Sequence, residues 1–197
     1  MVQKSGLYEA LNSNTRIYTD LVREFYANGV YDEETFTTSM KGTSLHLRAK
    51  EVNRALGFLN DGITSLSAIS GSEGLHRMHH RKEERFHGLK KKEFPQKYEF
   101  LADIVGKCIL CKDSAHDSVS DIQLKVMTAN VKRHQLNYGA ILLSWMGKKS
   151  QEKNPKKVFF GRFISILLKK FLKEQIKDAE GDPLNVNKRI TQRLFTH

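Results

Sequence analysis

The segments LVREFYAN (Leu21–Asn28) and MKGTSLHLRAKEVNRALGF (Met40–Phe58) carry the patterns that decide the fold of this chain. In the first segment and just before it, apolar residues recur at helical spacing between Ile17 and Tyr26. The pair Asn28-Gly29 then provides a typical helix end. The sequence therefore predicts an amphipathic helix from about Thr15 to Asn28.

The second segment begins with two Thr-rich stretches that flank Lys41-Gly42. Residues 35–40 and 43–47 are compatible with strands, and the glycine between them allows a tight turn. A short apolar pattern follows from Ala49 to Leu56, and Gly57 stands where a helix would end. We predict a small β-hairpin near residues 35–47, followed directly by a helix.

Helical patterns return after Pro95 and continue to about residue 177. The spacing of Ser120 and Gln123 is that of a capping box at a helix start, and Val119, Ile122, Val126 and Ala129 are predicted on the buried side of that helix. The other predicted helices cover Tyr98–Val105, Tyr138–Met146 and Val158–Lys177. The predicted fold class is mainly α: a compact multi-helix domain with one small hairpin and a flexible basic insert.

Composition changes sharply after Phe58. Residues 60–74 are rich in Ser, Gly and Asp, and residues 76–92 contain seven Lys or Arg with few apolar residues. We predict a flexible N-terminus at 1–14 and a single helical domain at 15–177. Within that domain a basic loop insert is expected at about 60–94, and a polar tail is expected at 178–197.

The balance of charge points to acidic partners. The 197 residues include 33 Lys or Arg against 22 Asp or Glu, a net charge of +11, which attracts RNA, DNA or acidic membrane surfaces. The longest apolar-rich stretch, Val158–Leu172, contains three basic residues and is too short to span a bilayer. Two cysteines make no disulfide framework, and the N-terminus lacks a signal-like apolar run. A cytoplasmic or nuclear protein is expected.

The opening segments, with the FYAN helix end and the hairpin-helix sequence after it, resemble a domain family described as plant transposon protein. The similarity continues through Val119-Ser120, the Asn137–Gly139 step and the apolar stretch Phe160–Leu172. This resemblance implies a mostly helical, retrotransposon- or other transposable-element-derived domain of plant origin. It carries no catalytic residues that could be transferred to this sequence.

Two clusters of basic residues are candidate nucleic-acid contacts. Few aromatic residues are interleaved with them, so any binding is expected to be indifferent to base sequence. The alternative is a set of solvated lysines on ordinary helices. The candidates are Arg77, Arg81, Lys82, Arg85, Lys90, Lys91, Lys92, Lys148, Lys149, Lys156, Lys157, Arg162, Lys169, Lys170 and Lys173.

A metal site is weakly suggested by Cys108, Cys111 and His116, whose spacing opens a zinc-knuckle pattern that Asp121 would complete. The loop lacks the glycines of a knuckle, and Asp121 suits the first turn of a helix, so we expect no metal. The histidines at 76, 79, 80 and 87 lack accompanying carboxylates or cysteines, which favours a pH-sensitive basic patch. No cofactor is expected.

No motif for phosphate cradling, serine hydrolysis or metalloprotease chemistry occurs, and no small-molecule substrate is evident. The predicted function is non-catalytic: self-association or partner binding with electrostatic contact to RNA or DNA, and no membrane. The runner-up is a structural or protein-interaction remnant without nucleic-acid binding. An element-encoded nuclease or zinc-dependent protein ranks third, because the acidic residues show no strand-borne pattern.

Overall fold

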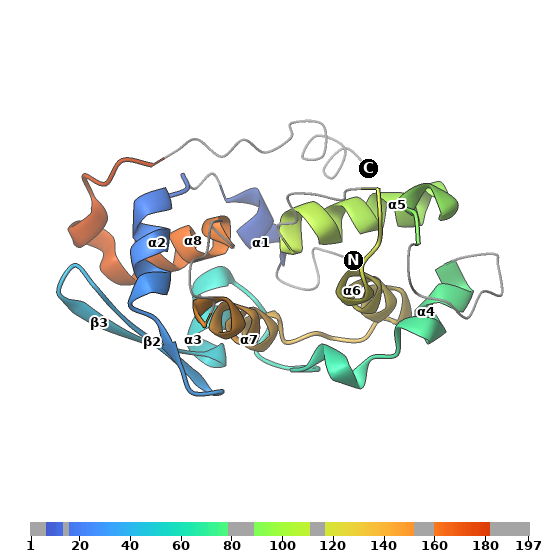
Figure 1. The fold of residues 1–197 in the computed structure, drawn as a ribbon, viewed down its shortest axis with the longest axis horizontal. Coiled ribbons are helices and arrows are strands. Elements are labelled where there is room, and N and C mark those ends of the chain that lie inside the picture. Colours follow the sequence, from blue (N-terminus) through green and yellow to red (C-terminus); the bar gives the residue numbers. More distant parts are fainter. Residues whose placement is uncertain (1–6, 14–15, 79–88, 111–116, 152–159, 182–197) are drawn as a thin grey trace. The chain divides into compact units, whose positions relative to one another are not determined.

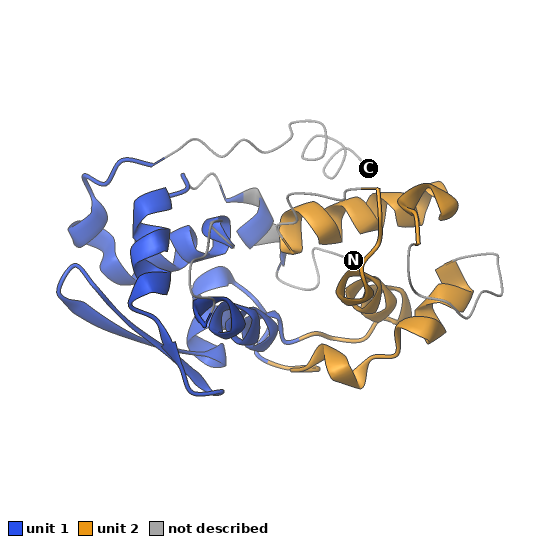
Figure 2. Cartoon of the chain, viewed as in Figure 1, with its two compact units in different colours: residues 1–60, 137–197 blue, residues 61–136 orange. Residues whose placement is uncertain are grey.

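The computed structural model describes residues 7–13, 16–78, 89–110, 117–151 and 160–181 (Figure 1). The described residues are mostly helical and include a small antiparallel sheet, which confirms the predicted class at that level. The chain divides into two compact units (Figure 2). Unit 1 comprises residues 1–60 and 137–197, and unit 2 comprises residues 61–136.

Unit 1 begins with helix α1, Leu7–Asn12, in the stretch that was expected to be a flexible terminus. That expectation is wrong for these residues because the side chains of Leu7, Ala10 and Leu11 are buried. Helix α2, Thr19–Ala27, starts later than predicted, after Tyr18 as its N-cap. Its buried face contains the predicted apolar residues, including Phe25 and Tyr26.

The predicted hairpin is confirmed as strands β2, Thr35–Met40, and β3, Thr43–Arg48. Lys41 and Gly42 between them have φ values of 47° and 76°, as a two-residue turn with two left-handed residues requires. A third strand, β1 (Val30–Tyr31), pairs with the other edge of β2 and was not predicted. Two residues are too few to produce a recognisable alternating pattern.

The core of unit 1 includes several contacts between aromatic rings. Phe25 of α2 stacks on Phe36 of β2 with ring centroids 4.7 Å apart. Helix α3, Ala49–Leu56, ends at Gly57 in the left-handed conformation, as predicted. Phe58 after it contacts Phe163 in an edge arrangement at 6.1 Å. These contacts join the sheet side of unit 1 to its C-terminal helices.

Those C-terminal helices are α7, Tyr138–Ser150, and α8, Gly161–Leu172. The single helix predicted for 158–177 is interrupted at Lys173, whose φ of 31° ends α8 before the 3-10 turn η5, Lys173–Ile176. The order of elements along the chain is therefore close to the prediction. Helix α8 is shorter than predicted, whereas α7 extends beyond the predicted end at Met146 to Ser150.

Asn53 holds together the two points where the chain leaves and re-enters unit 1. Its side-chain amide donates to Asn60 Oδ1 at 2.9 Å and to Asn137 Oδ1 at 2.8 Å. Its own Oδ1 accepts the backbone N–H of Gly139 at 2.7 Å. Because the buried amide is fully hydrogen-bonded, its polar atoms incur no unpaired desolvation cost.

Unit 2 contains the 3-10 turns η2, Leu66–Ala68, and η3, Lys91–Glu93, and the helix α4, Gly71–Met78. These elements lie in the range expected to be a loop, and the prediction is wrong there because Leu66, Ile69, Leu75 and Met78 are buried. Residues 79–88 of the expected insert lie outside the described residues.

The rest of unit 2 is α5, Gln96–Asp103, a π-helical segment η4, Ile104–Ile109, and α6, Asp121–Lys132. The capping box predicted at the start of α6 is confirmed, since the Ser120 side chain accepts from Gln123 N and Gln123 Oε1 accepts from Ser120 N. Gln123 is also buried and donates to Ala102 O at 2.6 Å. It thereby fixes α6 against the end of α5.

Candidate nucleic-acid interface

The positive charge of the chain is unevenly distributed. Residues 1–60 contain seven Lys or Arg and seven Asp or Glu, whereas residues 137–197 contain thirteen Lys or Arg and five Asp or Glu. The excess is greatest in residues 148–177, with ten Lys or Arg against two Glu. Within unit 1, the described candidate residues therefore lie in α7, in α8 and directly after α8.

Helix α8 separates charge from apolar surface. Phe163, Leu167 and Leu168 are almost fully buried, while Lys169 and Lys170 are exposed in its last turn. Lys173, which follows α8, is exposed as well. None of these three lysines forms an ion pair within the described part of the chain. Their ammonium groups are free to meet phosphate, and they also lie where a helix C-terminus favours cations.

The other candidates in unit 1 differ in accessibility. Lys148 is exposed near the end of α7, and Lys149 beside it is half-buried. Arg162 is half-buried, and its Nη2 donates to Ser13 O at 3.1 Å. Because its guanidinium is engaged within the fold, we leave Arg162 out of the interface. Lys156 and Lys157 lie outside the described residues.

Unit 2 places the remaining described candidates on α4 and η3. Arg77 is exposed in the last turn of α4, and Lys90 and Lys92 are exposed on either side of Lys91. Backbone hydrogen bonds from Lys91 N to Asp117 O and from Val119 N to Leu89 O fix this segment. Arg81, Lys82 and Arg85 lie outside the described residues.

Lys91 has an internal partner. Its Nζ lies 2.9 Å from Asp103 Oδ1, and Lys107 Nζ lies 3.1 Å from the same oxygen. Burial raises the pKa of Asp103, but the hydrogen bonds from Lys91 and Lys107 outweigh that effect, so its pKa is lowered from the ordinary 3.8. Lys91 therefore stabilises unit 2 and is less accessible to a partner than its two neighbours.

An open pocket of about 420 Å³ lies beside these lysines. It is lined by Lys90, Lys91, Lys92, Glu99 and Asp117. The two carboxylates were not among the predicted site residues, since the sequence argument looked only for positive charge. Glu99 and Asp117 are separated from the lysines in the sequence, so the sequence does not indicate that they share a pocket with them.

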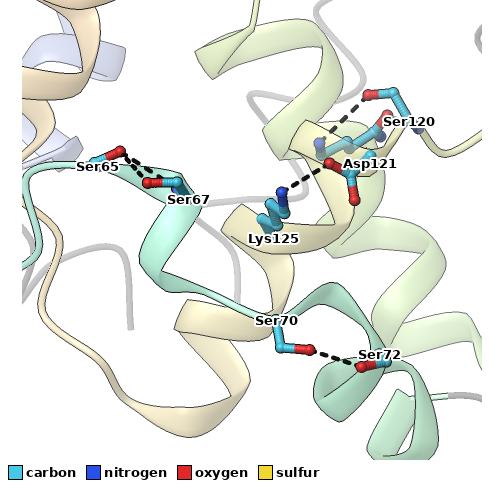
Figure 3. Close-up of polar contacts among 8 residues, drawn as sticks. Ser65, Ser67, Ser70, Ser72, Ser120, Asp121 and Lys125 are labelled. Carbon is cyan, nitrogen blue, oxygen red and sulfur yellow. Dashed lines mark hydrogen bonds and ion pairs between the residues drawn. The ribbon is translucent and has the colours of Figure 1, made fainter.

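Only some of the candidate metal ligands lie within the described residues. Cys108 is half-buried in η4, and Cys111 and His116 lie outside the described residues. Asp121 occupies the first turn of α6, where its Oδ2 pairs with Lys125 Nζ at 2.9 Å (Figure 3). Among described residues, no three His, Cys, Asp or Glu side chains gather closely enough to hold a metal ion.

Hydroxyl groups at η2 and α4 pair with one another. Ser65 and Ser67 Oγ lie 2.8 Å apart, and Ser70 and Ser72 Oγ lie 2.6 Å apart (Figure 3). Ser65 Oγ also accepts from Ser67 N at 3.3 Å, which caps the start of η2. Their hydroxyls have local partners, and we assign them no ligand.

Two further findings bear on function. Within the described residues, no helix is both long enough and apolar enough to cross a membrane. The chain matches no family model, and no curated protein or solved structure matches it. These comparisons therefore supply no functional assignment.

Proposed function

We propose that this protein is a non-catalytic nucleic-acid-binding protein whose contacts are electrostatic and indifferent to base sequence. The main support for the proposal is the excess of positive charge in residues 148–177, which contain ten Lys or Arg and two Glu. Lysines that neutralise phosphates release the counterions condensed on the nucleic acid, and this release drives binding. Lys148, Lys169, Lys170 and Lys173 are exposed contributors among the described residues, and Lys177 is also exposed but pairs with Glu174.

The character of the exposed surface supports indifference to base sequence. Among described residues, the large apolar side chains that are exposed are Val30, Leu59 and Ile122, and none is aromatic. Proteins that hold single-stranded bases usually stack them on exposed aromatic rings. A lysine surface without such rings recognises the phosphate backbone.

Descent from a plant transposable element and a gag-like role in assembly are further parts of the proposal. They rest on the resemblance of Leu21–Asn28 and Met40–Phe58 to the plant transposon family. Self-association would be tested by light scattering after size-exclusion chromatography in high salt. A concentration-dependent increase in mass is expected, and a strictly monomeric protein would remove the assembly role.

Nucleic-acid binding is tested by fluorescence anisotropy with a labelled 12-nucleotide single-stranded RNA between 50 and 200 mM KCl. The triple variant Lys169→Gln, Lys170→Gln, Lys173→Gln should reduce the slope of log K against log salt by about 2, since each phosphate contact on a single strand contributes about 0.7. The matched control Lys41→Gln, Lys50→Gln, Arg54→Gln removes the same charge elsewhere in unit 1 and should leave the slope unchanged.

The alternative function, a structural or protein-interaction role, predicts a different result. In that case the basic residues serve solubility, and no RNA affinity is measured even at 50 mM KCl. Equal slopes for the triple variant and its control would mean that the end of α8 is not the contact surface.

A further inference from the structure

We infer that the pocket beside η3 receives one nucleotide of single-stranded RNA and prefers ribose to deoxyribose. The inference rests on the proposed nucleic-acid binding and specifies its partner. The pocket is lined by three lysines, at 90–92, and by two acidic residues, Glu99 and Asp117, in a volume of about 420 Å³. Pockets that hold small ligands measure roughly 300–1,000 Å³, so a mononucleotide unit is of suitable size.

The charged residues of the pocket differ in whether they form an ion pair within the described part of the chain. Lys91 is held by Asp103, and its side chain is only 13% exposed. Lys90, Lys92, Glu99 and Asp117 have no ion-pair partner within the described part of the chain. Two lysines and two acidic residues without an ion-pair partner among the described residues therefore line one space.

This mixture selects the chemistry of the ligand. Ammonium groups bind phosphate oxygens, while carboxylates repel phosphate and accept hydrogen bonds from hydroxyl groups. A ribonucleotide presents a phosphate and a 2′-hydroxyl, which is the group that lets a protein distinguish RNA from DNA. A deoxyribonucleotide offers the phosphate but leaves a carboxylate without that hydrogen-bond donor.

The walls of the pocket are held in place independently of a ligand. Glu99 lies in the first turn of α5, and the backbone N–H of Glu99 donates to Pro95 O at 3.0 Å. Asp117 O accepts from Lys91 N at 2.7 Å, which fixes the opposite segment to η3. The Lys91–Asp103 pair then ties η3 to α5. The carboxylates can therefore be changed without removing a side-chain hydrogen bond or ion pair within the described part of the chain.

The experiment compares labelled oligouridine and oligodeoxyuridine 12-mers, which differ only in the 2′-hydroxyl, at 50 mM KCl. We expect wild-type protein to bind the RNA about fivefold more tightly, as one added hydrogen bond allows. Glu99→Ala and Asp117→Ala remove the acceptor oxygens and should bring this ratio toward one in at least one variant, without weakening binding of the DNA. Glu34→Ala removes an exposed carboxylate in unit 1 and should keep the ratio.

The possible failures are distinguishable. Equal binding of the two 12-mers by wild-type protein, or a ratio unchanged in both pocket variants, overturns the pocket and leaves the proposed function intact. No binding of either 12-mer overturns the proposed function. The pocket is then judged by titrating the isotope-labelled full chain with uridine and deoxyuridine 5′-monophosphates. Changes in the amide chemical shifts of residues 90–92 and 99 that the ribonucleotide causes and the deoxyribonucleotide does not would support the pocket. The absence of such changes overturns it.

Discussion

Unit 1 and unit 2 both include close approaches at glycine, as at Gly139 beside Asn53 in unit 1, but they differ in the side chains that fill their interiors. Unit 1 has an aromatic cluster in which Phe36 is fully buried and stacked on Phe25. In unit 2, the contact between α4 and α6 depends on glycine, since a Cβ added at Gly74 would overlap Thr128 Oγ1. Apolar side chains leave a periodic pattern in a sequence, whereas a contact made by the absence of a side chain leaves almost none.

The largest effect is expected from Phe36→Ala in unit 1. Truncating a fully buried phenylalanine costs about 3–5 kcal/mol, because apolar contacts are lost and a cavity remains. Urea denaturation would measure the loss, and Val30→Ala on the neighbouring strand is the control, since Val30 is 68% exposed. That control should stay within about 0.5 kcal/mol of wild type.

Hydrogen exchange would show whether the two units unfold separately in this variant. If the units are independent, peptides from α6 keep their protection under native conditions while peptides from β2 lose theirs. An equal loss in both would contradict the comparison, because a single cooperative transition would then cover the whole chain.

The next largest effect is expected from Gly74→Ala in unit 2. The added methyl group would overlap the side chain of Thr128, and forcing such overlap costs about 1–3 kcal/mol. Gly71→Ala is the matched control on the same helix, because its Cβ would lie 3.3 Å from Leu124 Cδ2 and 3.5 Å from Asp121 Oδ1, without the overlap found at Gly74. Thermal unfolding should show a loss for the first variant and little change for the second.

A double variant isolates the cause of that loss. Thr128 Oγ1 is buried and has no hydrogen-bond partner among the described residues, so Thr128→Ala alone should be nearly neutral. Combined with Gly74→Ala it should recover part of the lost stability. If the double variant is as unstable as Gly74→Ala, the overlap with Thr128 is not the reason.

The sequence predicted unit 1 better than unit 2 for the same physical reason. The hairpin and the α3 helix follow from local patterns around Gly42 and Gly57, and both are confirmed. Helix α4 was missed because its sequence, GSEGLHRM, contains two glycines and only two large apolar residues. Its helical state depends on contact with α6, which is about 50 residues further along the chain.

The candidate site could be predicted only in part. Composition locates the lysines at the end of α8 and in 90–92, and the structure places most of them at the surface. The internal roles of Arg162 and Lys91 depend on Ser13 and Asp103, partners that are 149 and 12 residues away. Side-chain partners at such separations cannot be inferred from one sequence without its fold.

A smaller effect is expected from pH in unit 2. The pKa of Asp103 is lowered in the folded chain, so between that value and 3.8 the unfolded chain binds more protons. The contribution of the carboxylate is therefore fully present above about pH 4 and is lost as the pH falls through the folded pKa. Because the ion pairs of Asp103 with Lys91 and Lys107 are partly solvated, we expect them to contribute less than about 1 kcal/mol to the free energy of unfolding.

Asp103→Asn is the variant that tests this contribution. Its stability should be lower than that of wild type at pH 7, and the difference should shrink as the pH approaches 3. Urea denaturation at several pH values measures it, with Asp20→Asn, an exposed carboxylate paired with Arg23 in unit 1, as the control. A difference that is constant between pH 7 and pH 3 would contradict the assigned role of the charge.

The smallest effect is expected from Ile122→Ala in α6. Periodicity predicted Ile122 on the buried side, and that prediction is wrong, because the residue is 44% exposed while its neighbour Gln123 is buried. The cause is the capping box: the Gln123 side chain turns inward to reach Ser120 N and Ala102 O, and Ile122 is thereby directed outward. We expect a change within about 0.5 kcal/mol, as for other surface positions.

Val126→Ala, one turn further along α6, provides the matched comparison. Val126 is 1% exposed, so its truncation should cost well over 1 kcal/mol by the usual loss of buried apolar contacts. Urea denaturation of the two variants distinguishes the capping arrangement from the simple periodic pattern. If Ile122→Ala were as costly as Val126→Ala, the apolar face of α6 would include Ile122, and Gln123 would not orient the start of the helix.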